Sequence, residues 1–204
     1  MKNYIIGIDE VGRGPLAGPV TVGVVMCEKK MYTTLTCDTK YRKSLPPLGK
    51  DSKKLSRKER ERYERVLKNL HKEGNIQYAV VHVSNTVIDI KGIVYAISKA
   101  MKEGIKKLQL DPKQCEVRLD GGLKAPMEFV RQKTIIKGDE KEQVIAWASI
   151  LAKVSRDALM VRLSNTYTDY GMEMHKGYGT LKHRNCIKNN GLSAIHRKTF
   201  CTRI

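Results

Sequence analysis

A short apolar segment near the start of the chain runs directly into two adjacent acids and then a glycine-flanked arginine. Residues 5–14 read Ile-Ile-Gly-Ile-Asp-Glu-Val-Gly-Arg-Gly. A regular strand sends successive side chains to opposite faces, so Asp9 and Glu10 can share one site only if the strand ends or bulges there. Gly12 and Gly14 favour such a break because glycine tolerates positive φ. The alternative is a strand that ends in a solvated acidic turn.

The charge of the chain indicates a polyanionic partner. The 204 residues include 39 Lys and Arg against 21 Asp and Glu, which gives a formal net charge of +18. The basic residues are spread along the whole sequence, so we expect a charged face on the folded domain. A basic protein with no such partner is the alternative.

Length and cysteine usage exclude several classes of protein. A chain of this length suits one domain with a sizeable core. The five cysteines are widely spaced and lack a Cys-x-x-Cys pair, which argues against a disulfide framework and a zinc site. No apolar run approaches the roughly 20 residues needed to cross a bilayer. We therefore expect a cytoplasmic protein without membrane contact.

Hydrophobic periodicity predicts an α/β domain with a mixed sheet. A strand near residues 20–26 follows the first closely enough to pair with it antiparallel, and a strand, helix and strand then form a crossover unit. Residues 29–50 are polar and broken by prolines and glycine, so we interpret them as a surface insertion. Residues 1–163 form the expected core, and residues 164–204 form a C-terminal helical extension of the same domain. Further strands are expected at 76–83, 115–119 and 133–136, and helices at 56–74, 87–108, 139–163 and 181–189.

Helix caps are expected at two places. Ser56 and Glu59 have the spacing of a capping box, and Asp139 and Glu142 are expected to cap the long helix that ends near Leu163.

Two further acids have unusual settings. Asp120 closes a strand and is followed by two glycines, as at Asp9, and ligand sites in open α/β sheets favour such strand ends. Asp157 lies at the margin of an apolar helical stripe, where an ionised carboxylate is costly unless it is paired or metal-bound. Lys153 is a possible partner, but Lys before Asp is the weaker orientation. We regard a metal as the stronger candidate partner of Asp157.

Four oxygen ligands suit a hard divalent cation such as Mg²⁺ or Mn²⁺. Two cations roughly 4 Å apart would stabilise both the attacking and the leaving oxygen of a phosphodiester displacement. The chemistry indicated is metal-dependent phosphodiester hydrolysis. A dispersed metal set of histidines is the less favoured reading, because they show no local ligand pair. Those histidines are His175, His183 and His196.

The chain resembles ribonuclease HII, the type 2 ribonucleases H. The resemblance covers nearly the whole chain, with its motifs in the family's order. They are Gly-Ile-Asp-Glu-Val-Gly-Arg-Gly at 7–14, Asp-Ser-Lys-Lys-Leu-Ser at 51–56, Leu-Asp-Gly at 119–121, Ala-Ser-Ile-Leu-Ala-Lys-Val at 148–154 followed by Arg156 and Asp157, and His-Lys-Gly-Tyr-Gly-Thr at 175–180.

The resemblance implies an RNase H-like fold and four metal-binding catalytic acids. It also implies an endonuclease that hydrolyses the RNA strand of RNA/DNA hybrids and incises on the 5′ side of single ribonucleotides in duplex DNA. The products would carry 3′-hydroxyl and 5′-phosphate ends. We expect the enzyme to be a monomer with two divalent ions in the reactive complex. The four acids are Asp9, Glu10, Asp120 and Asp157.

The resemblance also implies which residues bind the substrate. The motif Gly12, Arg13 and Gly14 would contact the 2′-hydroxyl that distinguishes RNA from DNA, together with nearby phosphates. Tyr178 would pack against the sugar of the following deoxynucleotide and hydrogen-bond the ribose, and Lys53 would contact a phosphate. Without the resemblance, an amphipathic surface tyrosine and a solvated lysine would be the simpler readings.

Two features depart from the family pattern. Trp147 occupies a position where the family usually has a small residue, and the segment 29–50 is longer than usual. Neither feature changes any of the four acids. The alternatives are a noncatalytic nucleic-acid-binding domain with the same fold, or another RNase H-like nuclease such as a resolvase or transposase. The presence of all four acids argues against the first, and the Gly-Arg-Gly and Tyr178 motifs argue against the second.

Overall fold

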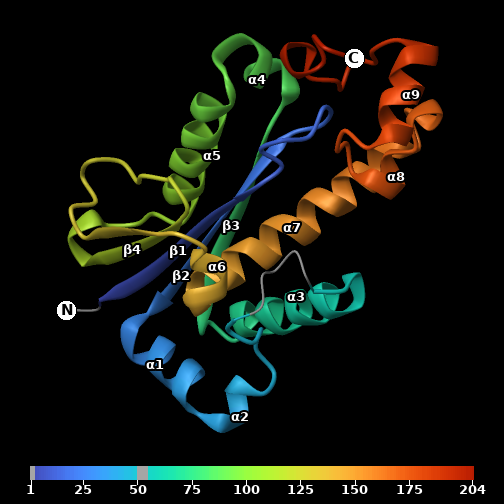
Figure 1. Cartoon of the computed structure of the whole chain (residues 1–204). Helices are drawn as coiled ribbons and strands as arrows, with labels where there is room; N and C mark the ends of the chain where they lie inside the picture. Colours follow the sequence, from blue (N-terminus) through green and yellow to red (C-terminus); the bar gives the residue numbers. More distant parts are fainter. Residues whose placement is uncertain (1–2, 50–54) are drawn as a thin grey trace.

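The computed structural model describes residues 3–49 and 55–204, and a five-stranded sheet lies at its centre (Figure 1). The strand order is β3-β2-β1-β4-β5; the first three strands pair antiparallel, and β4 pairs parallel with both β1 and β5. The expected mixed sheet is therefore confirmed. The strands are β1 (Tyr4–Val11), β2 (Val20–Glu28), β3 (Ile76–Val83), β4 (Cys115–Asp120) and β5 (Gln132–Ile135).

Helices cover both faces of the sheet. Helix α5 packs on one face, against β2 and β3, whereas α7 crosses the other face along β1 and β2 with α3 beside it (Figure 1). The described helices are α1 (Lys29–Cys37), α2 (Thr39–Arg42), α3 (Arg57–Lys72), α4 (Asn85–Lys91), α5 (Ile93–Lys107), α6 (Gly138–Lys141), α7 (Gln143–Ser164), α8 (Met172–His175) and α9 (Leu181–Asn190), with short 3-10 turns η2 (Pro112–Gln114), η3 (Thr168–Tyr170) and η4 (Lys198–Phe200).

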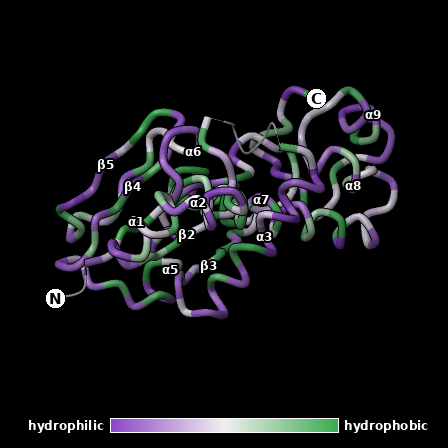
Figure 2. The backbone as a smooth tube through the Cα atoms, turned by 90° about the horizontal axis from the view of Figure 1, so that it is seen from below, coloured by the Kyte–Doolittle hydropathy of each residue, from purple (hydrophilic) through white to green (hydrophobic). Residues whose placement is uncertain are grey.

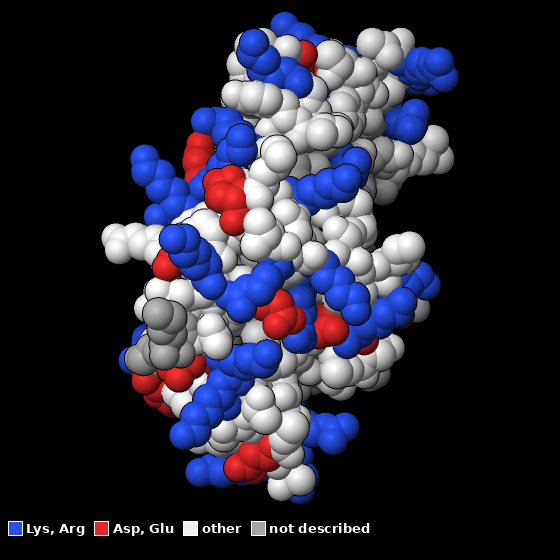
Figure 3. Space-filling view, turned by 90° about the vertical axis from the view of Figure 1, so that its left-hand side faces the viewer, with Lys and Arg blue, Asp and Glu red and all other residues white. Residues whose placement is uncertain are grey.

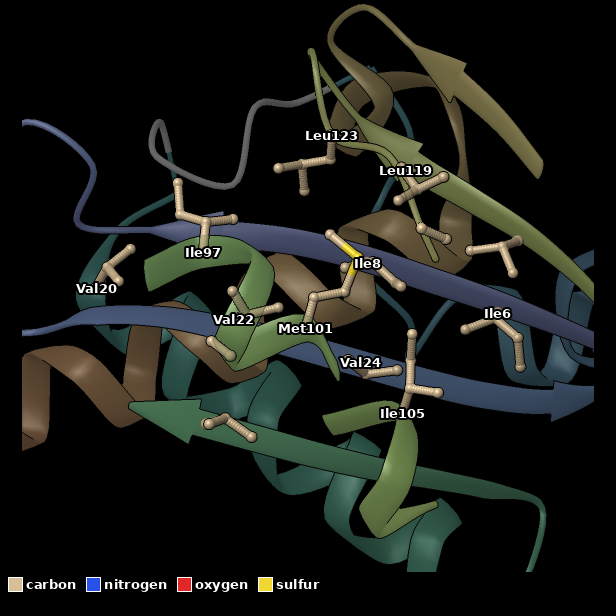
Figure 4. Packing of buried hydrophobic residues seen from close by; sticks show 14 of the residues in the cluster. Ile6, Ile8, Val20, Val22, Val24, Ile97, Met101, Ile105, Leu119 and Leu123 are labelled. Atoms are coloured by element: carbon tan, nitrogen blue, oxygen red, sulfur yellow. The ribbon is translucent and has the colours of Figure 1, made fainter. Parts of the chain in front are cut away.

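The core between α5 and the sheet is built from alternating strand residues. Ile6 and Ile8 of β1 are fully buried and face the apolar stripe of α5 that includes Ile97 and Met101 (Figure 4). Because strand side chains alternate, the same β1 sends Ile5, Gly7 and Asp9 toward α7. This alternation directs Asp9 to the α7 face.

Helix α7 lies unusually close to the sheet. A Cβ atom on Gly7 would lie 2.1 Å from the Val144 carbonyl oxygen, and one on Gly23 would lie 2.3 Å from that of Ala148. Only glycine fits at such a backbone approach. The contact fixes α7 over the end of β1, where Ser149 hydrogen-bonds Asp9.

The expected start of α3 is confirmed. The Ser56 hydroxyl accepts a hydrogen bond from the Glu59 amide, and the Glu59 carboxylate accepts one from the Ser56 amide, which completes a capping box. Tyr63, Leu67 and Leu70 form the buried stripe of the helix.

The segment 29–50 is not only a surface insertion, and in this respect the interpretation was wrong. It contains α1 and α2, and its Leu35 and Leu45 are buried in the core cluster between the sheet and α7. Tyr32 packs edge-on against Trp147, with 5.7 Å between ring centroids. Trp147 and the segment 29–50, the two features expected to depart from the family pattern, therefore contact each other.

Two other helix predictions need correction. The helix expected at 87–108 is divided into α4 and α5 at Gly92, whose φ of 83° a helix interior does not accept. Glu142 stands at the N-cap of α7 but its side chain makes no cap hydrogen bond; it bonds Arg118 Nη1 at 2.5 Å. Asp139 lies within α6.

The C-terminal segment packs beside the connection between β1 and β2 (Figure 1). The Leu16 amide donates to the Gly177 carbonyl at 2.8 Å, and Ala17 forms a bridge with His196. A separate apolar cluster, which includes Leu16, Met160 and Tyr170, joins the two parts.

Polarity is distributed as expected for a folded α/β domain. Hydrophobic residues gather along the central strands and α7, and hydrophilic residues dominate the outer loops (Figure 2). Lys and Arg are spread over the whole height of the face shown in Figure 3, with smaller groups of Asp and Glu between them. In the part of the chain that the structure describes, no helix has the length and apolarity to span a bilayer.

Candidate active site

Two of the predicted acids meet where parallel strands end. Ile8 of β1 pairs with Leu119 of β4, so the next residues, Asp9 and Asp120, are neighbours across the sheet. Both follow the alternation that directs their side chains to the α7 face. The structure therefore brings together acids that lie more than 100 residues apart in the sequence.

Asp9 is in an environment that disfavours its charge. It is 3% exposed, and its pKa is raised well above the usual range, first by burial and then by the nearby Asp120. A hydrogen bond with Ser149 acts in the opposite direction but does not cancel the effect. The Glu10 amide donates to Asp9 Oδ1 at 2.7 Å. A cation beside Asp9 would relieve this unfavourable electrostatic state.

The expected break in the strand is absent at Asp9 and Glu10, because β1 continues in register to Val11. By alternation the Glu10 side chain leaves β1 on the opposite face, yet its carboxylate still helps to raise the pKa of Asp9, so the two acids interact without a break in the strand. The pKa of Glu10 is raised by burial; Arg13, whose Nη1 lies 3.3 Å from Glu10 Oε1, counteracts this, and Asp120 adds to the rise. Asp9, Glu10 and Asp120 thus form one electrostatic group at the strand ends.

The structure adds one acid to this group that sequence reasoning treated as a helix cap. Asp139 of α6 is buried and contributes to the raised pKa of Asp9. Its neighbour Gly138 donates its amide to Asp120 Oδ1 at 2.6 Å. The available signal was an acid placed a few residues after the last strand of the sheet.

Asp157 is placed apart from the other three acids. Its carboxylate lies 2.8 Å from Lys153 Nζ and 3.9 Å from Arg60 Nη2, so the ion pair regarded as the weaker alternative is present. Asp157 lies eight residues beyond Ser149 on α7, roughly 12 Å along the helix axis. Among residues 3–49 and 55–204, no three His, Cys, Asp or Glu side chains form a ready metal-binding group.

The chemistry of the donors nevertheless fits a hard divalent ion. Asp9, Glu10 and Asp120 offer only carboxylate oxygen, which Mg²⁺ and Mn²⁺ prefer. Burial and mutual repulsion raise the pKa of Asp9 and of Glu10, and positive charge would reverse both effects.

A cleft of about 590 Å³ lies between α3, α7, α8 and the residues that follow α8. Asp157 and Tyr178 both line it. Its cationic side chains outnumber its acidic ones by five to two, so the cleft suits the phosphates of a nucleic acid. The cationic residues are Arg57, Arg60, Lys153, Arg162 and Lys176.

The predicted ribose-reading residues lie on two loops that are bonded to each other. The Arg13 side chain is 55% exposed, and a Cβ atom on Gly14 would meet nothing within 4 Å. Tyr178 is 39% exposed, and the guanidinium of Arg156 lies 5.8 Å from its ring centroid. Lys53, the expected phosphate contact, lies outside the described residues.

Comparison with known proteins identifies the family. The profile of the family described as Ribonuclease HII matches residues 6–203. The chain belongs to the ribonuclease HII family. A family member from Endomicrobium trichonymphae is 42% identical over 196 residues, which cover 96% of this chain and 84% of that protein. The suspected resemblance is confirmed, and the chain is accordingly an RNase H-type nuclease.

Solved structures show the same fold. The ribonuclease H2 of Pyrococcus horikoshii OT3 has a TM-score of 0.69 at 23% identity, with 97% of this chain and 95% of that chain covered. Bst-RNase HIII in complex with Mn²⁺ has a TM-score of 0.61 at 17% identity, with 98% and 65% covered. The expected RNase H-like architecture of this family member is confirmed.

Proposed function

We propose that this family member is a metal-dependent endoribonuclease that hydrolyses the RNA strand of RNA/DNA hybrids and incises on the 5′ side of single ribonucleotides in duplex DNA. It would leave 3′-hydroxyl and 5′-phosphate ends. The observation that carries the proposal is the buried Asp9 beside Asp120, at the carboxyl ends of two parallel strands. Helix α7 covers this end of the sheet and also lines the cationic cleft.

The acids have a common role in this proposal. Asp9, Glu10, Asp120 and the buried Asp139 would hold two divalent ions, Mg²⁺ or Mn²⁺. The similar Bst-RNase HIII structure is a complex with Mn²⁺. When bound, such ions supply Lewis acidity at the attacking and leaving oxygens of a phosphodiester. We do not assign Asp157 to this group, because its carboxylate is ion-paired with Lys153 and Arg60.

The exposed loops would supply selectivity. Gly12, Arg13 and Gly14 would contact the ribose 2′-hydroxyl, and Tyr178 would pack against the next deoxyribose. The two loops are hydrogen-bonded at Leu16 and Gly177, so they can present one combined surface to the strand. Such positioning orients the scissile bond, which affects the rate more than the affinity.

The cleft and Lys53 would bind phosphates of the strand beyond this junction. The cationic side chains of the cleft come from α3 and α7 and from the segment after α8, so binding would depend on the folded arrangement of all three. These contacts would carry no base sequence information.

The test is hydrolysis of an end-labelled RNA strand paired with DNA, in Mg²⁺, in Mn²⁺ and in EDTA. We expect cleavage only with a divalent ion. Asp120→Asn and Asp139→Asn should each reduce the rate by at least about 100-fold, the size of effect seen when an electrostatic contact to a transition state is lost. The exposed Asp169 of η3 offers the matched control, Asp169→Asn, which should keep the wild-type rate.

Circular dichroism and duplex binding complete this experiment. Folded acid variants that bind the hybrid but do not cut it support the assignment. Wild-type protein that binds the hybrid without cutting it under any ion would favour the noncatalytic alternative. Wild-type rates in both acid variants would contradict the catalytic roles.

A further inference from the structure

Two arginines are buried beneath the loop that carries the Gly-Arg-Gly motif. Arg156 and Arg197 both have 0% exposure. Arg197 donates from Nε to the Gly18 carbonyl at 3.0 Å, from Nη1 to Arg13 at 3.0 Å and from Nη2 to Gly12 at 2.7 Å. A single guanidinium thus holds three carbonyls of one loop.

Arg156 approaches the same loop from α7. Its Nε donates to the Pro19 carbonyl at 2.9 Å and its Nη2 to that of Ala17 at 3.3 Å. Its Nη1 donates to the Lys176 carbonyl at 3.0 Å, in the segment that carries Tyr178. Arg156 therefore joins the two loops proposed to read the sugar.

Neither guanidinium has an ion-pair partner. In residues 3–49 and 55–204, no carboxylate lies within 4.0 Å of Arg156 or Arg197. Burial lowers the pKa of both, and the neighbouring Arg156 helps to lower that of Arg197 to about 9. Asp157 acts on Arg156 and Asp89 on Arg197 in the opposite direction, but neither cancels the effect of burial. A buried charge without an ion pair is costly to a fold, so this pair calls for a functional reason.

The hydrogen bonds of Arg197 determine the direction of two amides. The described chain has only trans peptides, in which the N–H points opposite to the preceding carbonyl. Because the carbonyls of Gly12 and Arg13 point inward to Arg197, the amides of Arg13 and Gly14 point away from it. Within the described residues, neither amide has an acceptor in the protein. Two adjacent outward donors form a site for an oxygen or an anion.

We propose that Arg156 and Arg197 are positioning residues that orient the outward amides of Arg13 and Gly14, hold the Tyr178 loop against them, and supply buried positive charge that a substrate phosphate neutralises. This inference rests on the proposed function and deepens it. The two residues act through the loop backbone, and they do not touch the reacting atoms.

The pair affects selectivity more than general affinity. Affinity for duplexes comes from many exposed phosphate contacts, whereas recognition of one ribose requires the two loops to keep a fixed geometry. Lysine at either position keeps the charge but loses the planar fan of donors that reaches several carbonyls. Arg→Lys is therefore the informative substitution.

The experiment compares Arg156→Lys and Arg197→Lys with wild type on a single-ribonucleotide duplex and on an all-RNA strand paired with DNA. We expect kcat on the single-ribonucleotide duplex to fall at least about 30-fold, within the range that small misplacement of reacting groups produces. KM and the affinity for plain DNA should change less than about threefold, and the all-RNA hybrid should be affected several-fold less. The control is Arg131→Lys, because Arg131 also donates to a backbone carbonyl, that of Lys113, but near the opposite end of β4.

Equal losses on both duplexes would overturn the proposal, as would unchanged kcat in both folded variants. Wild-type protein that cuts neither duplex would instead refute the proposed function. A second experiment needs no variant: it measures the chemical shifts of N–H groups in ¹⁵N spectra of wild-type protein in EDTA when a duplex is added. The amides of Arg13 and Gly14 and the Nε–H groups of both arginines should shift with the single-ribonucleotide duplex more than with the matched DNA duplex. Equal shifts with both duplexes would overturn the inference, even where the lysine variants fail to fold.

Discussion

At the scale of single residues, the burial of Asp9 has a cost in stability. A carboxyl whose pKa is raised in the folded state adds stability at low pH, and this stability is lost as the pH rises through the folded pKa. At neutral pH, metal-free protein therefore holds an unfavourable acid beside Asp120. The negative charge of the ionised Asp9 carboxylate beside Asp120 is also what would attract a divalent ion.

We expect Asp9→Asn to raise the melting temperature of metal-free protein at pH 7 and to lower the cleavage rate by at least about 100-fold. The gain in stability should shrink toward pH 4, because Asp9 then holds its proton in wild type as well. Mg²⁺ or Mn²⁺ should raise the melting temperature of wild type more than that of the variant. Thermal unfolding with and without EDTA measures this, with Asp169→Asn as control. Lower stability of the metal-free Asp9→Asn variant would contradict this reading.

Tyr178 provides the residue-scale test of discrimination. Tyr178→Ala should impair cutting of a single-ribonucleotide duplex far more than it weakens binding, since the lost contact orients the junction and adds little to phosphate attraction. The comparison uses wild type and variant on that duplex and on an all-RNA strand paired with DNA. Equal loss on both, or no loss on the first, would show that Tyr178 does not read the junction.

At the scale of elements, a chain of histidines links α9 to the Tyr178 loop. The Ser193 amide donates to His196 Nδ1 at 2.9 Å, which leaves His196 Nε2–H to donate to His183 Nε2 at 3.1 Å. His183 Nδ1–H then donates to the Tyr178 carbonyl at 2.9 Å. The first two donations require neutral acceptor rings, His196 in one and His183 in the other, whereas the third persists when His183 is charged. Burial lowers the pKa of both histidines, that of His183 to about 4.

The free energy of unfolding should therefore fall as the pH drops from about 6.5 toward 4. The unfolded chain takes up a proton in this range that folded His183 does not accept, so the slope is up to about 1.4 kcal/mol per pH unit for this group. Above about pH 6.5, both folded and unfolded His183 are neutral, so this group no longer changes the free energy of unfolding with pH. Urea unfolding at pH 7.5, 6.5 and 5.5 measures the slope in wild type and in His183→Gln, which should show a smaller decline. Identical slopes would exclude His183 as the cause.

The elements with strong local signals could be predicted from the sequence. The five strands and the capping box of α3 follow from alternation and from cap spacing. Helix α1 could not be predicted in this way, because its buried Leu35 and its contact from Tyr32 to Trp147 depend on residues far along the chain. The division at Gly92 reflects a positive φ that periodicity does not reveal.

The candidate site was predictable only in part, for a similar reason. Acids at strand ends are visible in the sequence, and register brings Asp9 and Asp120 together. The burial of Arg156 and Arg197 depends on carbonyls more than 130 residues away, while arginine alone suggests a surface position. The four-residue spacing of Lys153 and Asp157 does indicate an ion pair, but the order Lys before Asp is the weaker one on an exposed helix and favoured a metal as the partner instead.

At the scale of the whole molecule, the net charge of +18 should govern duplex affinity. Basic residues line the cleft and are also spread over the face in Figure 3. Affinity should therefore fall steeply and linearly with salt on logarithmic axes and depend little on base sequence. Binding at several salt concentrations measures the slope, which Lys53→Ala should reduce by about one unit if Lys53 neutralises one phosphate. A flat plot would contradict this expectation.

The most direct measurement is the position of the cut in a DNA duplex that carries one ribonucleotide. Wild-type protein with Mg²⁺ or Mn²⁺ should cut once, on the 5′ side of the ribonucleotide, and leave a 3′-hydroxyl that a polymerase can extend. The same duplex with deoxyribose at that position should stay intact. Cutting on the 3′ side, or cutting that requires a run of ribonucleotides, would contradict the proposed function.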